Sequence, residues 1–278
     1  MIKIVSDTLS CIAPAEAQQA GIAYLPQVII FGEESFHDDY EITHQEFLQK
    51  LVSAKTLPTT SAPSPELYYP IYEEAIRNND TLIVVLPSDK MSGTLRSATV
   101  AAKDYEGLKI HFFDTGILAP AQGVMVRCAL DWAQEGLEAP QILTNLAALR
   151  DRQTSYFVVD TLEYLYRGGR IGAAKALLGS VLQIKPILGV EDGGIVPVES
   201  QRTTKKALNR LVELVEQQYP RDREGYLTLS HADARDRIEK IAEELKQRLG
   251  IAEIPIYNLP PAIMVHAGPG VVAAQFYK

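Results

Sequence analysis

The feature that most constrains the fold of this chain is the alternation of short apolar runs with longer amphipathic stretches. The short runs, rich in β-branched or aromatic residues, occupy residues 2–6, 82–86, 109–113, 155–159, 226–230 and 262–266. The stretches between them carry helical apolar spacing and helix-start signals. Strands that alternate with helices favour parallel strands joined by crossover helices. We therefore predict the α/β fold class.

Several turn and cap signals support these elements. Thr43 followed by Glu46 is a capping box ahead of an apolar run, and Asp233 precedes an amphipathic stretch at 235–249, which predicts two helices. Asp192-Gly193-Gly194 separates two apolar runs and predicts a β-hairpin through 187–200. The apolar stretch 173–184 is expected to be helical.

The length of 278 residues exceeds the size at which one hydrophobic core usually stops growing. The composition changes near residues 136–153, where a helix-like stretch ends in a polar segment before the next strand. We expect two domains, 1–150 and 151–278. The first carries the hydroxyl-rich segment 59–65 and the Ser-Gly-Thr turn at 92–94, and the second carries the basic segment 167–170 and His266.

The bulk numbers exclude several classes of function. A net charge of -8 disfavours nucleic acid, because binding phosphates requires a clustered cationic surface. No apolar run approaches the roughly 20 residues of a membrane span, so stable membrane insertion is not expected. Cys11 and Cys128 lie far apart in no metal-binding pattern, which argues against a disulfide framework and against a metal site. These features suit a cytoplasmic protein.

Polar residues follow directly after several of the apolar runs. The runs lead into residues 6–8, 88–94 and 114–116, and the last ends at His266. In open α/β sheets, ligands bind outside the carboxyl ends of the strands, so these side chains are expected to converge on one crevice. Ordinary turn residues would give the same pattern at any one of these positions.

The candidate ligand-binding residues are mostly uncharged donors. Thr60 and Ser61 lie in a segment expected to be a loop, whereas Ser64 with Pro65 is better explained as a helix start. Ser92 and Gly93 precede a predicted helix, where hydroxyl and backbone N–H groups would face an anion.

A second candidate set is basic. His266 is the histidine we single out among five, although a histidine in such a position is more often structural. Arg167 and Arg170, with Arg202 and two lysines at 205 and 206, form a basic set in an acidic chain. Guanidinium groups suit phosphate or carboxylate, and a glycine turn with solvated charges remains the plain alternative.

In this order along the chain, the motifs resemble those of the DegV family, whose members include the fatty-acid-binding subunits of bacterial fatty acid kinase. The matching segments are Asp7-Thr8, TTSAPSP at 59–65, MSGT at 91–94, Asp114-Thr115-Gly116, LEYLYRGGRIG at 162–172, KPIL at 185–188, QRTTKKAL at 201–208 and HAGPG at 266–270. Ala62 departs from the glutamine that is usual after the Thr-Ser pair, and Gly172 from the common serine.

The resemblance implies a two-domain fold, with a Rossmann-like parallel sheet in the N-terminal domain, a second α/β domain, and a lipid tunnel between or within them. It implies that Thr60 or Ser61, together with Ser92 and the Gly93 N–H, binds the carboxylate of a long-chain, palmitate-like fatty acid. His266 would complete that site.

The resemblance also implies partners. Arg170 and His266 would support phosphate transfer, and Arg170 and Arg202 would contact an ATP-dependent fatty acid kinase subunit. An acyl-phosphate acyltransferase would follow in phospholipid metabolism. No covalent cofactor is implied.

The physics of a fatty acid suits this reading. About fifteen methylenes at roughly 0.8 kcal/mol each give on the order of 10 kcal/mol before ordering costs. The carboxylate must instead be hydrogen-bonded when buried. The sequence contains no phosphate-binding loop or protein-kinase signature, so the chain is expected to be a carrier that acts with a separate kinase.

Three alternatives stay open at this point. A serine hydrolase would use Ser92 as nucleophile, His266 as base and Asp7 to orient it, although no G-x-S-x-G motif is present. A small-molecule phosphotransfer enzyme would use the strand-end glycines and the basic turn. A regulatory lipid sensor would use the same pocket as a carrier.

Overall fold

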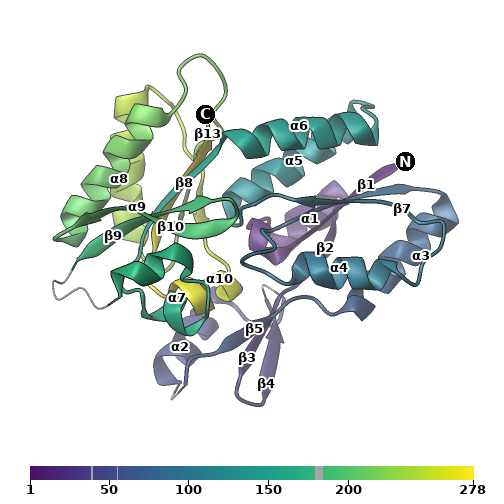
Figure 1. Ribbon diagram of the computed structural model, residues 1–278, viewed down its shortest axis with the longest axis horizontal. Coiled ribbons are helices and arrows are strands. Elements are labelled where there is room, and N and C mark those ends of the chain that lie inside the picture. Colours follow the sequence, from purple (N-terminus) through teal and green to yellow (C-terminus); the bar gives the residue numbers. More distant parts are fainter. Residues whose placement is uncertain (39, 55, 179–183) are drawn as a thin grey trace. The chain divides into compact units, whose positions relative to one another are not determined.

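The computed structural model describes residues 1–38, 40–54, 56–178 and 184–278. The chain divides into two compact units, which are described separately (Figure 1). The first comprises Met1–Arg150 with Pro260–Ala262, and the second comprises Asp151–Leu259 with Ile263–Lys278.

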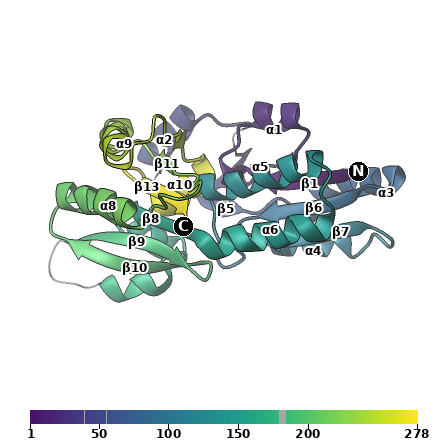
Figure 2. The same ribbon diagram turned by 90° about the horizontal axis from the view of Figure 1, so that it is seen from above.

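The first unit is built on a parallel four-stranded sheet with strand order β2-β1-β6-β7 (Figures 1 and 2). Its strands are β1 (Ile2–Asp7), β2 (Ala23–Leu25), β6 (Thr81–Leu86) and β7 (Lys109–Asp114). Helices α3 (Tyr69–Asn78) and α4 (Thr94–Ala102) contribute to a buried apolar cluster on one face, and α5 (Pro120–Gln134) packs on β1 and β6. The predicted parallel sheet is therefore confirmed.

A small antiparallel sheet in the same unit differs from the prediction. Its strands are β3 (Val28–Phe31), β4 (Glu34–His37) and β5 (Thr59–Ser61), in the order β4-β3-β5. The loop predicted over Thr60 and Ser61 is therefore wrong, because Thr60 pairs with Ile29. The pairing partner lies about thirty residues away, where a local turn signal does not reveal it.

The remaining elements of this unit surround the two sheets. They are η1 (Thr8–Ser10), α1 (Pro14–Ala20), α2 (His44–Ser53), η2 (Pro65–Tyr68) and most of α6 (Ala139–Arg152). The predicted capping box of α2 is confirmed, since the Glu46 N–H donates to Thr43 Oγ1 at 3.2 Å and the Thr43 N–H donates to Glu46 Oε2 at 2.9 Å.

The second unit contains a six-stranded sheet with strand order β10-β9-β8-β13-β11-β12. Its strands are β8 (Gln153–Val158), β9 (Lys185–Glu191), β10 (Gly194–Gln201), β11 (Thr228–His231), β12 (Ile256–Asn258) and β13 (Val272–Tyr277). Only the β11–β12 pair is parallel among the strand pairs of the described residues in this sheet. The general expectation of parallel strands therefore fails for this unit.

The antiparallel pairs have clear local causes. The predicted hairpin is confirmed as β9–β10, with Asp192 at φ 47° and Gly193 at φ 75°, the left-handed conformations of a two-residue hairpin turn. The final strand, β13, lies between β8 and β11 and runs antiparallel to both. A strand from the chain end inserted in this way cannot be anticipated from periodicity.

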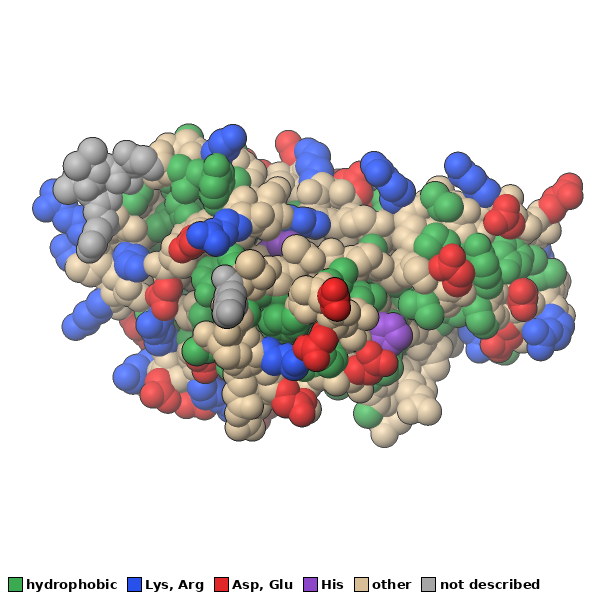
Figure 3. Space-filling model, turned by 90° about the horizontal axis from the view of Figure 1, so that it is seen from below, with side chains coloured by type: hydrophobic (Ala, Val, Ile, Leu, Met, Phe, Trp, Pro, Cys, Tyr) green, Lys and Arg blue, Asp and Glu red, His purple; other side chains and the backbone are tan. Residues whose placement is uncertain are grey.

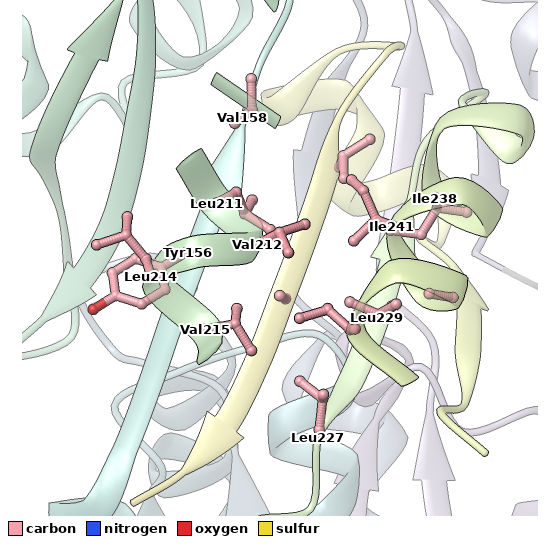
Figure 4. Packing of buried hydrophobic residues seen from close by; sticks show 14 of the residues in the cluster. Tyr156, Val158, Leu211, Val212, Leu214, Val215, Leu227, Leu229, Ile238 and Ile241 are labelled. Atoms are coloured by element: carbon pink, nitrogen blue, oxygen red, sulfur yellow. The ribbon is translucent and has the colours of Figure 1, made fainter. Parts of the chain in front are cut away.

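The core of the second unit lies where α8 (Thr204–Gln218) and α9 (Arg235–Leu249) pack on the sheet. Figure 4 shows Val212 of α8 and Ile241 of α9 in this cluster beside Leu229 of the sheet. Helix α9 covers the predicted stretch 235–249, with Ala234 as its N-cap and Asp233 just before it at φ 50°.

Two further predictions concern short segments. The predicted strand at 262–266 is wrong, since Pro261–Ala267 forms helix α10. Pro261 suits the first turn of a helix, and so short an apolar run does not distinguish strand from helix. In the stretch 173–184, η3 covers Gly172–Leu177, and residues 179–183 lie outside the described residues. The unit also contains α7 (Glu163–Arg167).

Candidate functional site

The carboxyl ends of the parallel strands bring polar residues to one edge of the first unit's sheet. Asp7 ends β1 and Asp114 ends β7, with β6 between these two strands, and the connections that follow β6 and β7 are hydrogen-bonded to each other. The Ser88 N–H donates to Ile117 O at 2.8 Å, and the Gly116 N–H donates to Asp114 Oδ1 at 2.8 Å. The predicted convergence of strand ends is seen for the segments at 6–8, 88–94 and 114–116 of the first unit, whereas His266 does not directly follow a strand and lies in α10.

Ser92 and Gly93 lie between β6 and α4, as predicted. Ser92 is only 9% exposed, and its Oγ lies 2.8 Å from Thr94 Oγ1 and accepts from the Thr94 N–H at 3.3 Å. Gly93 is the exposed N-cap of α4. The turn thus combines a held hydroxyl with the amino end of a nine-residue helix, an arrangement that favours an anion.

The segment that follows β5 packs against this turn. A Cβ placed on Gly93 would lie 3.7 Å from Ala62 Cβ, and Ser97 Oγ of α4 donates to Pro63 O. Thr60 is half-buried, and Ser61 is exposed with its hydroxyl donating to Ala62 O at 3.1 Å. The hydroxyl-bearing strand and the Ser-Gly-Thr turn are therefore neighbours within one unit.

The predicted helix start at Ser64 is correct in position. Pro65 begins η2 with Ser64 as the N-cap, although the Ser64 side chain makes no capping hydrogen bond.

A buried polar network that the sequence did not predict lies behind Ser92. Gln27 Nε2 donates to Asp7 Oδ2 at 2.7 Å and to Thr94 Oγ1 at 2.9 Å, and Gln122 Nε2 donates to Asp7 Oδ1 at 3.0 Å. Asp7, Thr94 and Gln122 are all 0% exposed. The sequence signal for Gln122 was its place, as a polar residue, on the buried side of the apolar stretch that follows Pro120.

The Asp7 carboxyl has an altered pKa. Burial raises its pKa from 3.8 to about 6, against hydrogen bonds from Gln122, Thr94, the Leu9 N–H and Gln27. These donors are uncharged, so they solvate the carboxylate without a neutralising counter-ion.

The same contacts disfavour the hydrolase alternative. Each Asp7 oxygen accepts a hydrogen bond from a glutamine amide, and every hydrogen bond described for this carboxyl comes from an amide, a hydroxyl or a backbone N–H. An acid that orients a catalytic histidine needs an oxygen directed at the imidazole. Asp7 is instead bound within its own unit.

The second unit brings Arg170 and His266 together at Gly168. Arg170 follows α7, and its Nη1 donates to Gly168 O at 2.7 Å. His266 lies in the last turn of α10, and a Cβ placed on Gly168 would come within 2.3 Å of His266 Nδ1. Only a glycine at 168 leaves room for the imidazole in this position.

The electrostatics of this pair suit an anion. Burial, with a smaller contribution from the charge of Arg170, lowers the pKa of His266 from 6.5 to about 4. Burial also lowers the pKa of the Arg170 guanidinium. At neutral pH the pair is a partly desolvated cation beside a neutral imidazole, so a phosphate or carboxylate placed there would compensate Arg170.

Arg202 lies apart from this pair in sequence and is exposed in the connection between β10 and α8. The neighbouring Thr203 caps α8 by accepting from the Lys206 N–H at 3.2 Å. On the face drawn in Figure 3, Lys and Arg side chains are interspersed with Asp and Glu. The predicted partner contact at Arg202 stays a prediction.

Together these observations define a two-unit α/β protein with an uncharged, hydroxyl-rich site at a sheet edge and an Arg-His pair in its second unit. The chain belongs to the DegV family, because residues 1–278 match the model of that family, which is described as an uncharacterised protein of the DegV family. Within the described residues, no helix is long and apolar enough to cross a membrane.

Relatives match over nearly the full length. A DegV domain-containing protein of Halalkalibacterium halodurans is 34% identical over 277 residues, covering 99% of this chain and 98% of the relative. A solved DegV family protein from Thermus thermophilus, described by its fatty acid binding, has a TM-score of 0.91 and 30% identity, with 100% of this chain and 99% of that chain covered. DegV of Bacillus subtilis, a fatty acid binding protein, has a TM-score of 0.89 and 30% identity, with 100% and 99% covered.

Proposed function

We propose that this chain is a cytoplasmic carrier that binds one long-chain fatty acid and presents its carboxylate to a separate kinase for acyl-phosphate formation. Thr60 or Ser61, Ser92 and the Gly93 N–H bind the carboxylate, with His266 completing the site. The acyl chain lies in an apolar tunnel and supplies most of the affinity.

The observation that carries this proposal is the packing of the segment after β5 on the Ser-Gly-Thr turn. It brings Thr60 and Ser61 close in the fold to Ser92 and to the amino end of α4. Hydroxyl and N–H donors stabilise a carboxylate without fixing it in an ion pair, so the group stays available as a nucleophile. The fatty acid binding of the Thermus thermophilus and Bacillus subtilis relatives supports the same ligand.

The division of labour with a kinase follows from charge. Arg170 and His266 present a cation and a neutral imidazole, which suit the phosphoryl group that is transferred. Exposed Arg202 is proposed as a contact for the kinase subunit. The acyl phosphate formed would pass to an acyltransferase that consumes it.

The test is native mass spectrometry of freshly purified protein, followed by organic extraction of any bound lipid. We expect one fatty acid per chain, and reduced retention in Thr60→Ala. Thr59→Ala is the matched control, because Thr59 is an exposed neighbour in the same strand.

Two outcomes would refute the carrier. Purified chain that never binds fatty acid while a fluorophosphonate probe labels Ser92 stoichiometrically would favour the hydrolase. Micromolar ATP binding by the isolated chain would favour the phosphotransfer enzyme.

A further inference from the structure

Asp7 and Ser92 are joined through a single hydroxyl. Ser92 Oγ lies 2.8 Å from Thr94 Oγ1, and Thr94 is in turn one of the hydrogen-bond donors to the Asp7 carboxyl. Gln27 Nε2 donates to both Asp7 Oδ2 and Thr94 Oγ1, at 2.7 and 2.9 Å, and so fixes the two groups relative to each other. The result is a buried chain from a carboxyl group to the hydroxyl at the candidate site.

The number of protons in this hydrogen-bonded network determines whether Ser92 can donate to a ligand. A hydroxyl carries one proton, so Thr94 cannot donate to Asp7 and to Ser92 at the same time. When Asp7 is ionised, the Thr94 proton points to Asp7 and the Ser92 proton points to Thr94. Ser92 then offers only lone pairs to a ligand.

Protonation of Asp7 reverses the direction of the hydrogen bonds that link it to Ser92. The Asp7 hydroxyl donates to Thr94, and Thr94 donates to Ser92, whose Oγ also accepts from the Thr94 N–H at 3.3 Å. The Ser92 proton is then released to donate outward. Gln27 donates to Thr94 in both states, so its hydrogen bond need not change.

We propose that Asp7 is a positioning residue that sets the direction of the Ser92 hydroxyl through Thr94, and that Asp7 and a bound fatty acid share one proton. An ionised ligand is bound by the donor form of Ser92 when Asp7 carries the proton. This inference rests on the proposed role of Ser92 and adds a regulated proton to it.

The groups around Asp7 do not compete with it for this proton between pH 6 and 8. From η2 it is faced by the Tyr68 phenol, whose pKa is raised by burial and by the charge of Asp7. From β2, the Tyr24 phenol is hydrogen-bonded within the η1 region. The basic residue of α4, Arg96, is exposed. The basic residue of α5, Arg127, forms an ion pair with Glu16 of α1, with Nε 2.7 Å from Oε1.

The affinity for an ionised ligand should therefore depend on pH. With a pKa of about 6, Asp7 is about half protonated at pH 6 and roughly 1% protonated at pH 8. A ligand that requires protonated Asp7 should bind about 50-fold more weakly at pH 8 than at pH 6. A simple carboxylic acid has a pKa of about 4 to 5, so the ligand itself stays ionised over this range.

The experiment is calorimetric titration of the delipidated chain with decanoate from pH 6 to pH 8, in buffers of low and high ionisation enthalpy. We expect the 50-fold loss of affinity, and uptake of about one proton per decanoate at pH 8. Asp7→Asn should abolish both effects. Asp114→Asn, which alters the half-buried carboxyl at the end of β7 in the same sheet, should keep both.

A second pair of variants keeps the test valid if Asp7→Asn fails to fold. Thr94→Val breaks the hydroxyl chain and should flatten the pH dependence with Asp7 intact, and Thr94→Ser should restore it. A flat profile in the wild type, or a profile that persists in Thr94→Val, overturns this inference alone. Absence of decanoate and palmitate binding at every pH would instead refute the proposed function.

Discussion

Removing the charge of Asp7 should change how the stability of the first unit depends on pH. Asp7 is 0% exposed, and burial raises the pKa of its carboxyl from 3.8 to about 6. The folded chain therefore binds more protons than the unfolded chain between these pH values. For this group, stability is highest below pH 4 and is lost as pH rises towards 6.

The size of the effect follows from the same shift. A rise of the pKa from 3.8 to about 6 corresponds to about 3 kcal/mol, which the ionised Asp7 costs the folded state at neutral pH. Asp7→Asn removes this dependence. It also places an amide nitrogen opposite Gln27 or Gln122, which adds an offset that does not vary with pH.

The assay is urea unfolding of wild type and Asp7→Asn at intervals from pH 4 to pH 7.5. Trp132 is the only tryptophan in the sequence and lies on α5, the helix that carries Gln122, so its fluorescence reports on this unit. The difference in unfolding free energy between the two proteins should change by about 2.5 kcal/mol in favour of the variant between pH 4 and pH 7.5, because the unfolded carboxyl is already partly ionised at pH 4. A difference that is constant, or that changes in the opposite direction, would refute the conclusion that burial without a counter-ion raises the pKa of Asp7.

The remaining predictions concern the two candidate sites. Ser92→Ala should weaken fatty acid binding by about 100-fold at pH 6, the upper range for the loss of one hydrogen bond to a charged group. Thr99→Ala on the exposed side of α4 should not weaken binding, as measured by calorimetry. Arg170→Ala should leave binding within about threefold and reduce acyl-phosphate formation with the kinase at least tenfold. Arg167→Ala is the control, because Arg167 forms an exposed ion pair with Glu163. A loss of binding in Arg170→Ala as large as the loss of acyl-phosphate formation would contradict this division. Because the pKa of His266 is lowered from 6.5 to about 4, wild type should lose up to about 3 kcal/mol as pH falls through this window, and His266→Asn should not, as measured by urea unfolding.

Much of the first unit could be predicted because its signals are local. The runs at 2–6, 82–86 and 109–113 became neighbouring parallel strands, and the capping box at Thr43 and Glu46 formed as expected. Each signal depends on residues within one element or turn, where periodicity and capping determine the backbone.

The errors occurred where distant pairing decides the conformation. Thr60 became part of a strand because Ile29 pairs with it, and β13 entered the second sheet between two strands from earlier in the chain. The segment at 262–266 became a helix because Pro261 begins it, although its apolar residues alone suit a strand equally well. Local propensity yields to tertiary context in each case.

The candidate site was predictable in position but not in charge state. Ser92 and Gly93 could be located from the turn between a strand and a helix, whereas Gln27 and Gln122 lie 20 and 115 residues from Asp7 and meet it only in the fold. Without these amides, the sequence leaves open an alternative in which Asp7 is the orienting acid of a hydrolase. The two hydrogen bonds argue against that alternative, because both oxygens of the Asp7 carboxyl already accept hydrogen bonds from glutamine amides and not from a histidine.

The shifts at Asp7 and His266 share one physical cause. Burial is the largest contribution to both, and each shift favours the neutral form of its group. A site that binds a carboxylate away from water must already tolerate the charge of the ligand, and each further buried ion would add its own desolvation cost. Groups that are easily neutralised keep that cost small. A carboxyl that takes up a proton readily and an uncharged imidazole therefore suit the proposed carrier, in which the ligand supplies the negative charge.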